Sequence, residues 1–195
     1  MNNVKEIIDF RGRTPKKLGL TWTPSGSFAA LSALNIKNGY IDTTVDAHFG
    51  DELLYSRWMK SSELRKDDII FTTEAPMGNV VVLHHNDHHY ILSQRVIALR
   101  PDVEMVNSAF LGVALTTPGI HQLLRRLSTG GTAHGVSQRN LKFLEFMVPG
   151  EISEQKKIGQ LSNFVDALIV ANERQRMLSK KGSIEIRQLT ITNIL

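Results

Sequence analysis

The last third of the sequence contains a long segment with the hydrophobic spacing of a coiled-coil helix. Residues 151–181 include no proline, and one row of residues in this segment recurs at alternating intervals of three and four. The row consists of Leu161, Phe164, Leu168, Ala171, Gln175 and Leu178. Apolar side chains at this spacing form a seam along one face of a helix, and such a seam needs a partner. The pattern predicts a helix over about residues 153–181, roughly 43 Å long at 1.5 Å per residue.

A second row of apolar residues widens the seam. Ile158, Val165 and Ile169 lie beside it on the same predicted face. An apolar face of this width exceeds the minimum for a two-stranded coil and has to be covered. Either the helix folds back on its own domain or it pairs with a helix from a second chain, and the length of the seam favours the second chain. The expected dimer or partner interface consists of Leu161, Phe164, Val165, Leu168, Ala171 and Leu178.

The first hundred residues have the short apolar runs and frequent turns of β structure. Residues 69–72 and 80–83 form two runs separated by a turn that contains Pro, Gly and Asn, and residues 90–101 supply another strand that ends at Pro101. Over residues 108–127 the apolar spacing changes to that of a helix, with a break at 117–119, which predicts two short helices. The sequence therefore predicts an α+β fold, with a β-rich domain over residues 1–150 and a coiled-coil-type helical segment over residues 151–195.

Positive charge is concentrated in two short stretches, although the formal net charge is only +4. One stretch contains Arg11, Arg13, Lys16 and Lys17, and the other contains Arg125, Arg126, Arg139 and Lys142. Local clustering of this kind suits a polyanion such as nucleic acid better than the small total charge suggests. A solvated basic surface without a partner is the alternative that charge alone leaves open.

Residues 127–141, LSTGGTAHGVSQRNL, form a loop rich in glycine and hydroxyl side chains. A phosphate-binding loop of the Walker type ends in Gly-Lys-Ser/Thr, whereas no lysine follows Gly130, Gly131 and Thr132 here. The loop also follows a predicted helix and not a strand. Its backbone N–H groups, together with Thr129 and Thr132, suit the phosphodiester backbone of DNA. A plain flexible connection explains the composition equally well.

Several other kinds of site have little support in the sequence. The absence of cysteine excludes disulfides, thiolate zinc sites and cysteine nucleophiles, and it fits a reducing cytosol. No window approaches the roughly eighteen apolar residues of a membrane span, so we expect a soluble, cytoplasmic protein without a membrane partner. The HHNDHH stretch at residues 84–89 is interpreted as the solvated tip of a hairpin, and neither a metal site nor a cofactor is expected.

Metal-dependent cleavage of nucleic acid needs clustered carboxylates. Asp67, Asp68 and Glu74 lie close together in the sequence, and a nuclease that uses them is one alternative. Asp67 and Asp68 also fit the polar turn before a strand, and nothing in the spacing joins them to further acids. Neither a glycine-rich turn for a methyl donor nor an Asn/Asp-Pro-Pro-aromatic motif is present, so methyl transfer is not expected of this chain.

The order of six stretches resembles that of a known protein family. The stretches are VKEIIDFRGRTPKKLG, LNIKNGYID, LRKDDIIFTTEAPMGNVVVL, YILSQRVIALRP, LSTGGTAHGVSQRNLKFLEFMVP and SEQKKIGQLSNFVDALI. Together, over about residues 4–182, they resemble one target-recognition domain and its connector helix from the specificity subunit of type I restriction–modification enzymes. The resemblance implies a non-catalytic subunit that reads double-stranded DNA and positions methyltransferase subunits, and sometimes restriction subunits, on a bipartite site. An orphan DNA-binding module without enzyme partners is a further alternative.

The usual subunit of that family differs from this chain because it contains two such domains and two such helices, in about twice the length. Two copies of this chain, joined through antiparallel helices, restore the pair of readers. A symmetric homodimer of this kind requires a palindromic bipartite site. Residues 183–195 match the family pattern less well.

The resemblance also separates expected base contacts from expected phosphate contacts. Stretches shared by family members that read different sequences cannot encode the difference, so base contacts are expected in residues 20–30, 44–62 and parts of 103–135. Arginine pairs with guanine and Asn or Gln with adenine, which makes Arg57, Asn107 and Gln122 the candidates for base contacts. The expected phosphate contacts are Arg11, Arg13, Lys16, Lys17, Thr129, Thr132 and Arg139.

Overall fold

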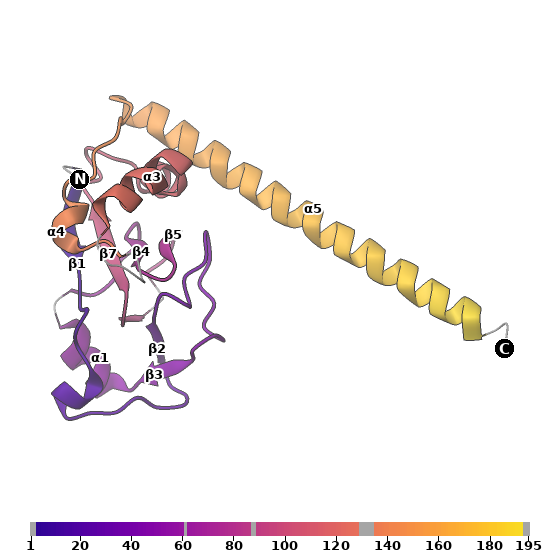
Figure 1. Cartoon of the computed structure of the whole chain (residues 1–195), viewed down its shortest axis with the longest axis horizontal. Helices are drawn as coiled ribbons and strands as arrows, with labels where there is room; N and C mark the ends of the chain where they lie inside the picture. Colours follow the sequence, from indigo (N-terminus) through magenta and orange to yellow (C-terminus); the bar gives the residue numbers. More distant parts are fainter. Residues whose placement is uncertain (1–2, 61, 87–88, 129–134, 193–195) are drawn as a thin grey trace. The chain divides into compact units, whose positions relative to one another are not determined.

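The computed structural model describes residues 3–60, 62–86, 89–128 and 135–192, and it describes side chains as far as Arg176 except for those of Val170, Glu173 and Arg174. The chain divides into two compact units, Met1–Gly159 and Gln160–Leu195. Each unit is described below by itself. The first unit holds both sheets and all the short helices (Figure 1).

The larger sheet of the first unit has four antiparallel strands in the order β1-β7-β4-β5. Their bounds are β1 Val4–Ile8, β4 Ile69–Thr73, β5 Met77–Val82 and β7 Val96–Pro101. The two runs predicted from residues 69–72 and 80–83 are therefore confirmed as the neighbouring strands β4 and β5. Strand β7 ends at Pro101, as predicted, since proline cannot donate to a continuing ladder.

The smaller sheet has three strands in the order β3-β2-β6. Strand β2, Phe28–Leu31, pairs antiparallel with β3, His48–Gly50, and parallel with β6, Ile91–Leu92. Residues 90–101 were predicted as one strand, but the structure divides them into β6 in the smaller sheet and β7 in the larger one. The hairpin interpretation of residues 84–89 is wrong for the same reason, because β5 and β6 on either side belong to different sheets.

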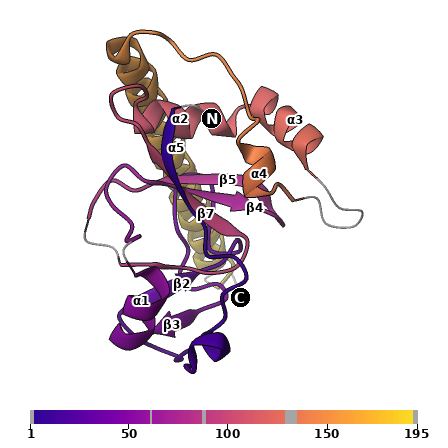
Figure 2. The same cartoon turned by 90° about the vertical axis from the view of Figure 1, so that its left-hand side faces the viewer.

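Helices cover the larger sheet on one side. Helices α2, Ser108–Thr116, and α3, Pro118–Leu127, are separated at Thr117, which confirms the predicted break. A short helix α4, Gln138–Leu141, forms the end of the stretch 127–141 that the sequence predicted as a glycine-rich loop. Figure 2 shows α2, α3 and α4 on one side of the sheet and α1, Glu52–Met59, with the smaller sheet on the other.

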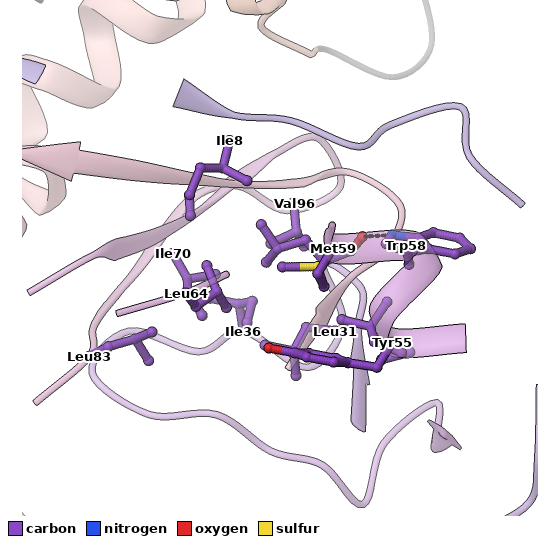
Figure 3. Packing of buried hydrophobic residues seen from close by; sticks show 14 of the residues in the cluster. Ile8, Leu31, Ile36, Tyr55, Trp58, Met59, Leu64, Ile70, Leu83 and Val96 are labelled. Carbon is purple, nitrogen blue, oxygen red and sulfur yellow. Dashed lines mark hydrogen bonds between the residues drawn. The ribbon is translucent and has the colours of Figure 1, made fainter. Parts of the chain in front are cut away.

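Side chains of β4 and β7 alternate between two hydrophobic clusters. One cluster packs Ile69, Phe71, Ile97 and Leu99 against the helices α2 to α4. The other packs the intervening side chains of the same two strands against α1 and the smaller sheet (Figure 3). Strands buried on both faces read as continuous apolar runs, which is the pattern of residues 69–71 and 96–99. The sequence prediction of an α+β fold is confirmed.

Helix α5, Ile152–Thr192, is the predicted long helix, and it continues beyond the predicted end at residue 181. Its start is held within the first unit by Gln155, which is fully buried. The Gln155 amide accepts a hydrogen bond from the Asn107 backbone N–H at 2.8 Å and donates to the carbonyls of Pro149 at 2.8 Å and Met105 at 3.3 Å. Residues 152–159 thus belong to the first unit, and the division by packing falls after Gly159. No helix within the described residues is both long and apolar enough to cross a bilayer.

Replacement of Gln155 by alanine should lower the free energy of unfolding of the first unit by about 2–3 kcal/mol, because three partly buried backbone groups lose the buried amide as their partner. Urea denaturation followed by tryptophan fluorescence measures this change, since Trp22 and Trp58 both lie in the first unit. The matched control is Gln160→Ala, a substitution at an exposed position one turn later, and it should leave the midpoint unchanged. Equal midpoints for the two variants would contradict the assigned role of Gln155.

Candidate nucleic-acid interface

The structure brings four basic residues together into a cluster that we call the first basic patch: Arg13, Lys16, Lys17 and Arg57. A 3-10 helix, Pro15–Leu18, carries the two lysines and is capped at both ends. The Thr14 side chain accepts from the Lys17 N–H, and Gly19 adopts the left-handed conformation at φ 69° that ends the turn. Arg57, from α1, reaches this turn through a contact of 3.4 Å from its Nη1 to the carbonyl of Leu18. Arg13 and Arg57, about 45 positions apart in the sequence, thereby present their charges on one surface.

Arg13 and Lys17 are oriented by contacts within this patch. The Arg13 guanidinium lies over the Phe10 ring, 4.3 Å from its centre, and donates to the Trp58 carbonyl. The Lys17 ammonium donates to the Gly12 carbonyl at 2.8 Å. Neither of these contacts is an ion pair, because aromatic faces and carbonyls orient a cation without a countercharge. Lys16 is exposed on the same turn. The first basic patch is therefore suited to phosphate.

Arg11 has a different environment from the one predicted for a phosphate contact. Its Nε and Nη2 groups donate to the Asp9 carboxylate at 2.5–3.0 Å, so the charge is paired. Its Nη1 group donates to Thr73 Oγ1 and to the Val136 carbonyl, both at 3.3 Å. The Arg11 side chain therefore joins the ends of β1 and β4 to Val136, which lies within the glycine-rich stretch 127–141. We assign Arg11 to positioning that loop, and no longer to direct phosphate contact.

A second basic patch, defined as Arg125, Arg126 and Arg139, flanks the glycine-rich loop. The first two lie in the last turn of α3 and the third lies on α4, and all three are exposed. The Asn140 side chain donates to the Leu127 carbonyl at 2.9 Å and so fixes α4 beside the end of α3. Ser137 caps α4 by accepting from the Asn140 N–H at 3.0 Å. Thr129 and Thr132, the predicted phosphate contacts within the loop, lie outside the described residues.

The three residues predicted to read bases lie in different settings. Arg57 belongs to the first basic patch. Gln122 is exposed on α3, one helical turn before Arg125 and Arg126, so it shares a face with the second patch. The Asn107 side chain caps α2 by accepting from the Phe110 N–H at 3.1 Å, beside the Gln155 contact. Asn107 thus has a structural role, and we no longer count it among the base readers.

The carboxylates of the nuclease alternative have separate partners. Arg100 donates to both oxygens of the buried Asp68 at 2.8–2.9 Å and to Glu6 at 2.6 Å. The hydrogen bonds that Arg100 donates to Asp68 are the main reason that the pKa of Arg100 is raised. Asp67 accepts from the Ser108 hydroxyl at 2.9 Å, and Glu74 pairs with Arg95 at 3.4 Å. Within the described residues no three His, Cys, Asp or Glu side chains gather in a group that could hold a metal ion.

Sequence reasoning missed a polar cavity of about 230 Å³ beside the smaller sheet. Its lining includes Trp22, Ser32, Asp46, His48 and Gln94. Trp22, Asp46 and His48 fall in the stretches 20–30 and 44–62 where base contacts were expected, but no residue of these three was singled out. The signal in the sequence is weak, because the lining comes from three separate segments that only the strand pairing of the smaller sheet brings together.

Comparison with solved structures agrees with the fold. A chain from a study titled as the structural basis of complex assembly and conformational transition of the type I R-M system matches with a TM-score of 0.56 at 15% identity, over 87% of this chain and 37% of that one. The S subunit of the type I restriction–modification system of M. genitalium matches with a TM-score of 0.53 at 17% identity, over 86% of this chain and 40% of that one. This chain therefore spans about two fifths of the length of the structures it matches.

A protein-family model matches most of the chain. No curated protein matches the chain. The family model described as the type I restriction modification DNA specificity domain matches residues 3–180, which include both basic patches, both sheets and most of α5. The chain belongs to the family of type I restriction–modification DNA specificity domains, which are non-catalytic.

Proposed function

We propose that this chain reads one half of a bipartite DNA site and presents it to the catalytic subunits of a type I restriction–modification system. The family match over residues 3–180 is the observation that carries this proposal. In this proposal Arg13, Lys16 and Lys17 of the first basic patch and Arg139 of the second contact phosphates, while Arg57 and Gln122 contact bases. Residues 1–150 form the target-recognition domain, and residues 151–195 form the connecting and dimerisation segment. Methyltransferase subunits, and restriction subunits where the system has them, supply the chemistry in the cytoplasm.

The double variant Lys16→Ala, Lys17→Ala tests the phosphate contacts. Binding should weaken for every DNA sequence, and the slope of log K against log salt should become shallower by about one to two units, because each phosphate contact contributes about 0.9. Fluorescence anisotropy with labelled duplexes at several salt concentrations measures both quantities. The matched control is Lys156→Ala, Lys157→Ala, which removes the same charge from two exposed positions on α5. An altered sequence preference at an unchanged slope would mean that these lysines read bases.

Dimerisation through α5 completes the proposal, because one recognition domain reads one half-site. The predicted seam presents large apolar side chains to solvent, with exposures of 64% at Leu161, 62% at Phe164 and 53% at Leu168. Val165 and Ala171 are also exposed, whereas the side chain of Leu178 lies outside the described residues. Pairing of two such helices in antiparallel orientation buries these groups and gives the dimer a twofold axis. At 1.5 Å per residue the 41 residues of α5 extend about 60 Å, a length that suits a spacer between two half-sites.

The variant Leu168→Asp tests the seam. A charge buried twice in a symmetric interface should weaken dimerisation at least about tenfold, while the first unit keeps its thermal unfolding midpoint. Sedimentation velocity at tens of micromolar measures the association. Asn163→Asp introduces the same charge at an exposed position outside the predicted seam and should leave the dimer intact. A wild-type chain that stays monomeric at this concentration would overturn the proposed dimer.

The nuclease alternative is distinguished by the variant Asp68→Asn. If Asp68 is a structural carboxylate paired with Arg100, this substitution should lower the free energy of unfolding by about 3 kcal/mol, because the arginine loses this partner. In a metal site without its metal, removing one of several repelling carboxylates leaves stability unchanged or raises it. Urea denaturation measures the difference, with the exposed Glu104→Gln as control. Cleavage of plasmid DNA by the wild-type chain with Mg²⁺, and its loss in Asp68→Asn, would support the nuclease instead.

An orphan DNA-binding module differs from the proposed subunit only because it has no enzyme partners. Co-purification with a methyltransferase subunit of a type I system supports the proposed assembly. A chain that binds a specific DNA site and dimerises, yet captures no methyltransferase subunit, is an orphan reader.

A further inference from the structure

We propose that the cavity beside the smaller sheet reads the edge of a base that carries an exocyclic amino group, with Asp46 as the acceptor. This inference rests on the proposed DNA-reading function and names a residue that determines specificity. The cavity is about 230 Å³, which gives room for the edge of a base. The side chains of Asp46 and His48 are 37% and 49% exposed, so a ligand in solvent reaches both.

The Asp46 carboxylate is held in place but incompletely satisfied. Its backbone adopts the left-handed conformation, φ 50°, which aspartate and asparagine tolerate better than most residues. The Ser32 hydroxyl lies 2.9 Å from Asp46 Oδ2 and 2.9 Å from Asn35 Oδ1. A hydroxyl has a single proton, so it serves one of these two acceptors at a time. A carboxylate offers about four acceptor positions. His48 Nδ1 lies 3.5 Å from Asp46 Oδ1, a long contact, so acceptor positions remain for a donor in the cavity that Asp46 lines.

His48, like Asp46, offers the cavity a hydrogen-bond acceptor. Its Nδ1 lies 3.0 Å from the Asp46 backbone carbonyl, which can only accept, so Nδ1 carries the proton. In the neutral ring the other nitrogen, Nε2, is then an acceptor. The Trp22 ring meets the His48 ring edge-on at 6.2 Å and limits its movement. The Asp46 carboxylate and a neutral His48 ring together make a site that accepts hydrogen bonds.

The cavity adjoins the first basic patch. The Trp22 ring, which lines the cavity, packs against the Trp58 ring at 5.2 Å, and the Trp58 carbonyl accepts from Arg13 of the patch. DNA whose phosphates contact the patch therefore presents its groove next to the cavity. A carboxylate there repels phosphate, and the only donors that a major-groove edge offers it are the amino groups of adenine N6 and cytosine N4. Guanine and thymine present O6 or O4 acceptors, which a carboxylate opposes.

Three other features of the first unit lack this combination. The opening near Asn3, Leu144 and Phe146 has a mixed polar and apolar lining, and nothing in the structure indicates what covers it. The Nε2 of His121 is buried without a hydrogen-bond partner among the described residues, but the His121 ring fills the space over Gly78 and leaves no room for a ligand. The Arg100 network is satisfied internally by Asp68 and Glu6. Among the described residues, the Asp46 cavity combines open space, a charged acceptor with room for a further donor and a neighbouring basic surface.

The test compares DNA selected from a random duplex library by the full-length wild type and by Asp46→Asn. Asparagine keeps the shape and tolerates the same backbone conformation, but it replaces a charged acceptor by an amide. The wild type should prefer adenine or cytosine at one position of its half-site. Asp46→Asn should relax that preference about tenfold or more, with the other positions and the slope of binding against salt retained. Glu52→Gln, which removes one exposed carboxylate on α1 outside the cavity, should leave all preferences unchanged.

A series of base analogues on the wild-type site needs no variant and covers the case in which Asp46→Asn does not fold. Purine in place of adenine, or 2-pyrimidinone in place of cytosine, removes the amino group alone. Wild-type binding should fall about tenfold at one position and at that position only. A loss with purine identifies adenine as the base, and a loss with 2-pyrimidinone identifies cytosine.

The outcomes separate this inference from the proposed function. If the wild type selects no sequence at all, the DNA-reading function fails and the inference fails with it. If the wild type selects a site but tolerates loss of the amino group at every position, the function stands and the role of Asp46 is refuted. An unchanged preference in a folded Asp46→Asn variant refutes it in the same way.

Discussion

Burial of β4 and β7 on both faces is the constraint on which the first unit depends. Successive side chains of these strands point into opposite clusters, so one sheet serves as the wall of two hydrophobic cores. The helices α2, α3 and α4 need the cluster on one face, and α1 with the smaller sheet needs the cluster on the other. A polar substitution at Ile70 or Phe71 therefore affects structure on both sides. The charged network of Arg100, Asp68 and Glu6 lies at the edge of this arrangement and ties β1, β7 and the start of β4 together.

This arrangement also explains how the interface residues acquire fixed positions. The first basic patch stands on η1 and α1, which pack on one cluster, and the second stands on α3 and α4, which pack on the other. Because the same sheet supports both clusters, the two patches belong to one rigid unit despite their distance in sequence. A reader of DNA needs this property, since phosphate contacts define the register in which base edges are presented.

Helices and strands whose apolar pattern is local could be predicted from the sequence. Contacts that depend on tertiary structure could not. The strands β4 and β5, the break between α2 and α3 and the helix α5 follow from apolar spacing within a few residues. The division of residues 90–101 between two sheets did not follow, because the pairing of β6 with β2 joins segments about sixty residues apart. Among the site residues, exposure of Lys16 and Arg139 matched the charge pattern. The pairing of Arg11 with Asp9 and the capping role of Asn107 involve neighbours close in sequence, yet charge and hydrogen-bonding capacity alone do not reveal which partner a side chain selects.

The sequence predicted that the first domain ends at about residue 150, whereas the first compact unit of the structure extends to Gly159. Residues 152–159 are part of helix α5 and also part of the first unit, fixed by the buried amide of Gln155 and by the close approach of Gly159 to Ala109 and Phe110. A β-carbon on Gly159 would come within 2.8 Å of the Phe110 nitrogen, so the helix approaches α2 closely there. The first two turns of α5 are therefore held by the packing of the first unit, so a substitution at Gln155 or Gly159 acts on the stability of that unit and not on the exposed seam that begins at Leu161.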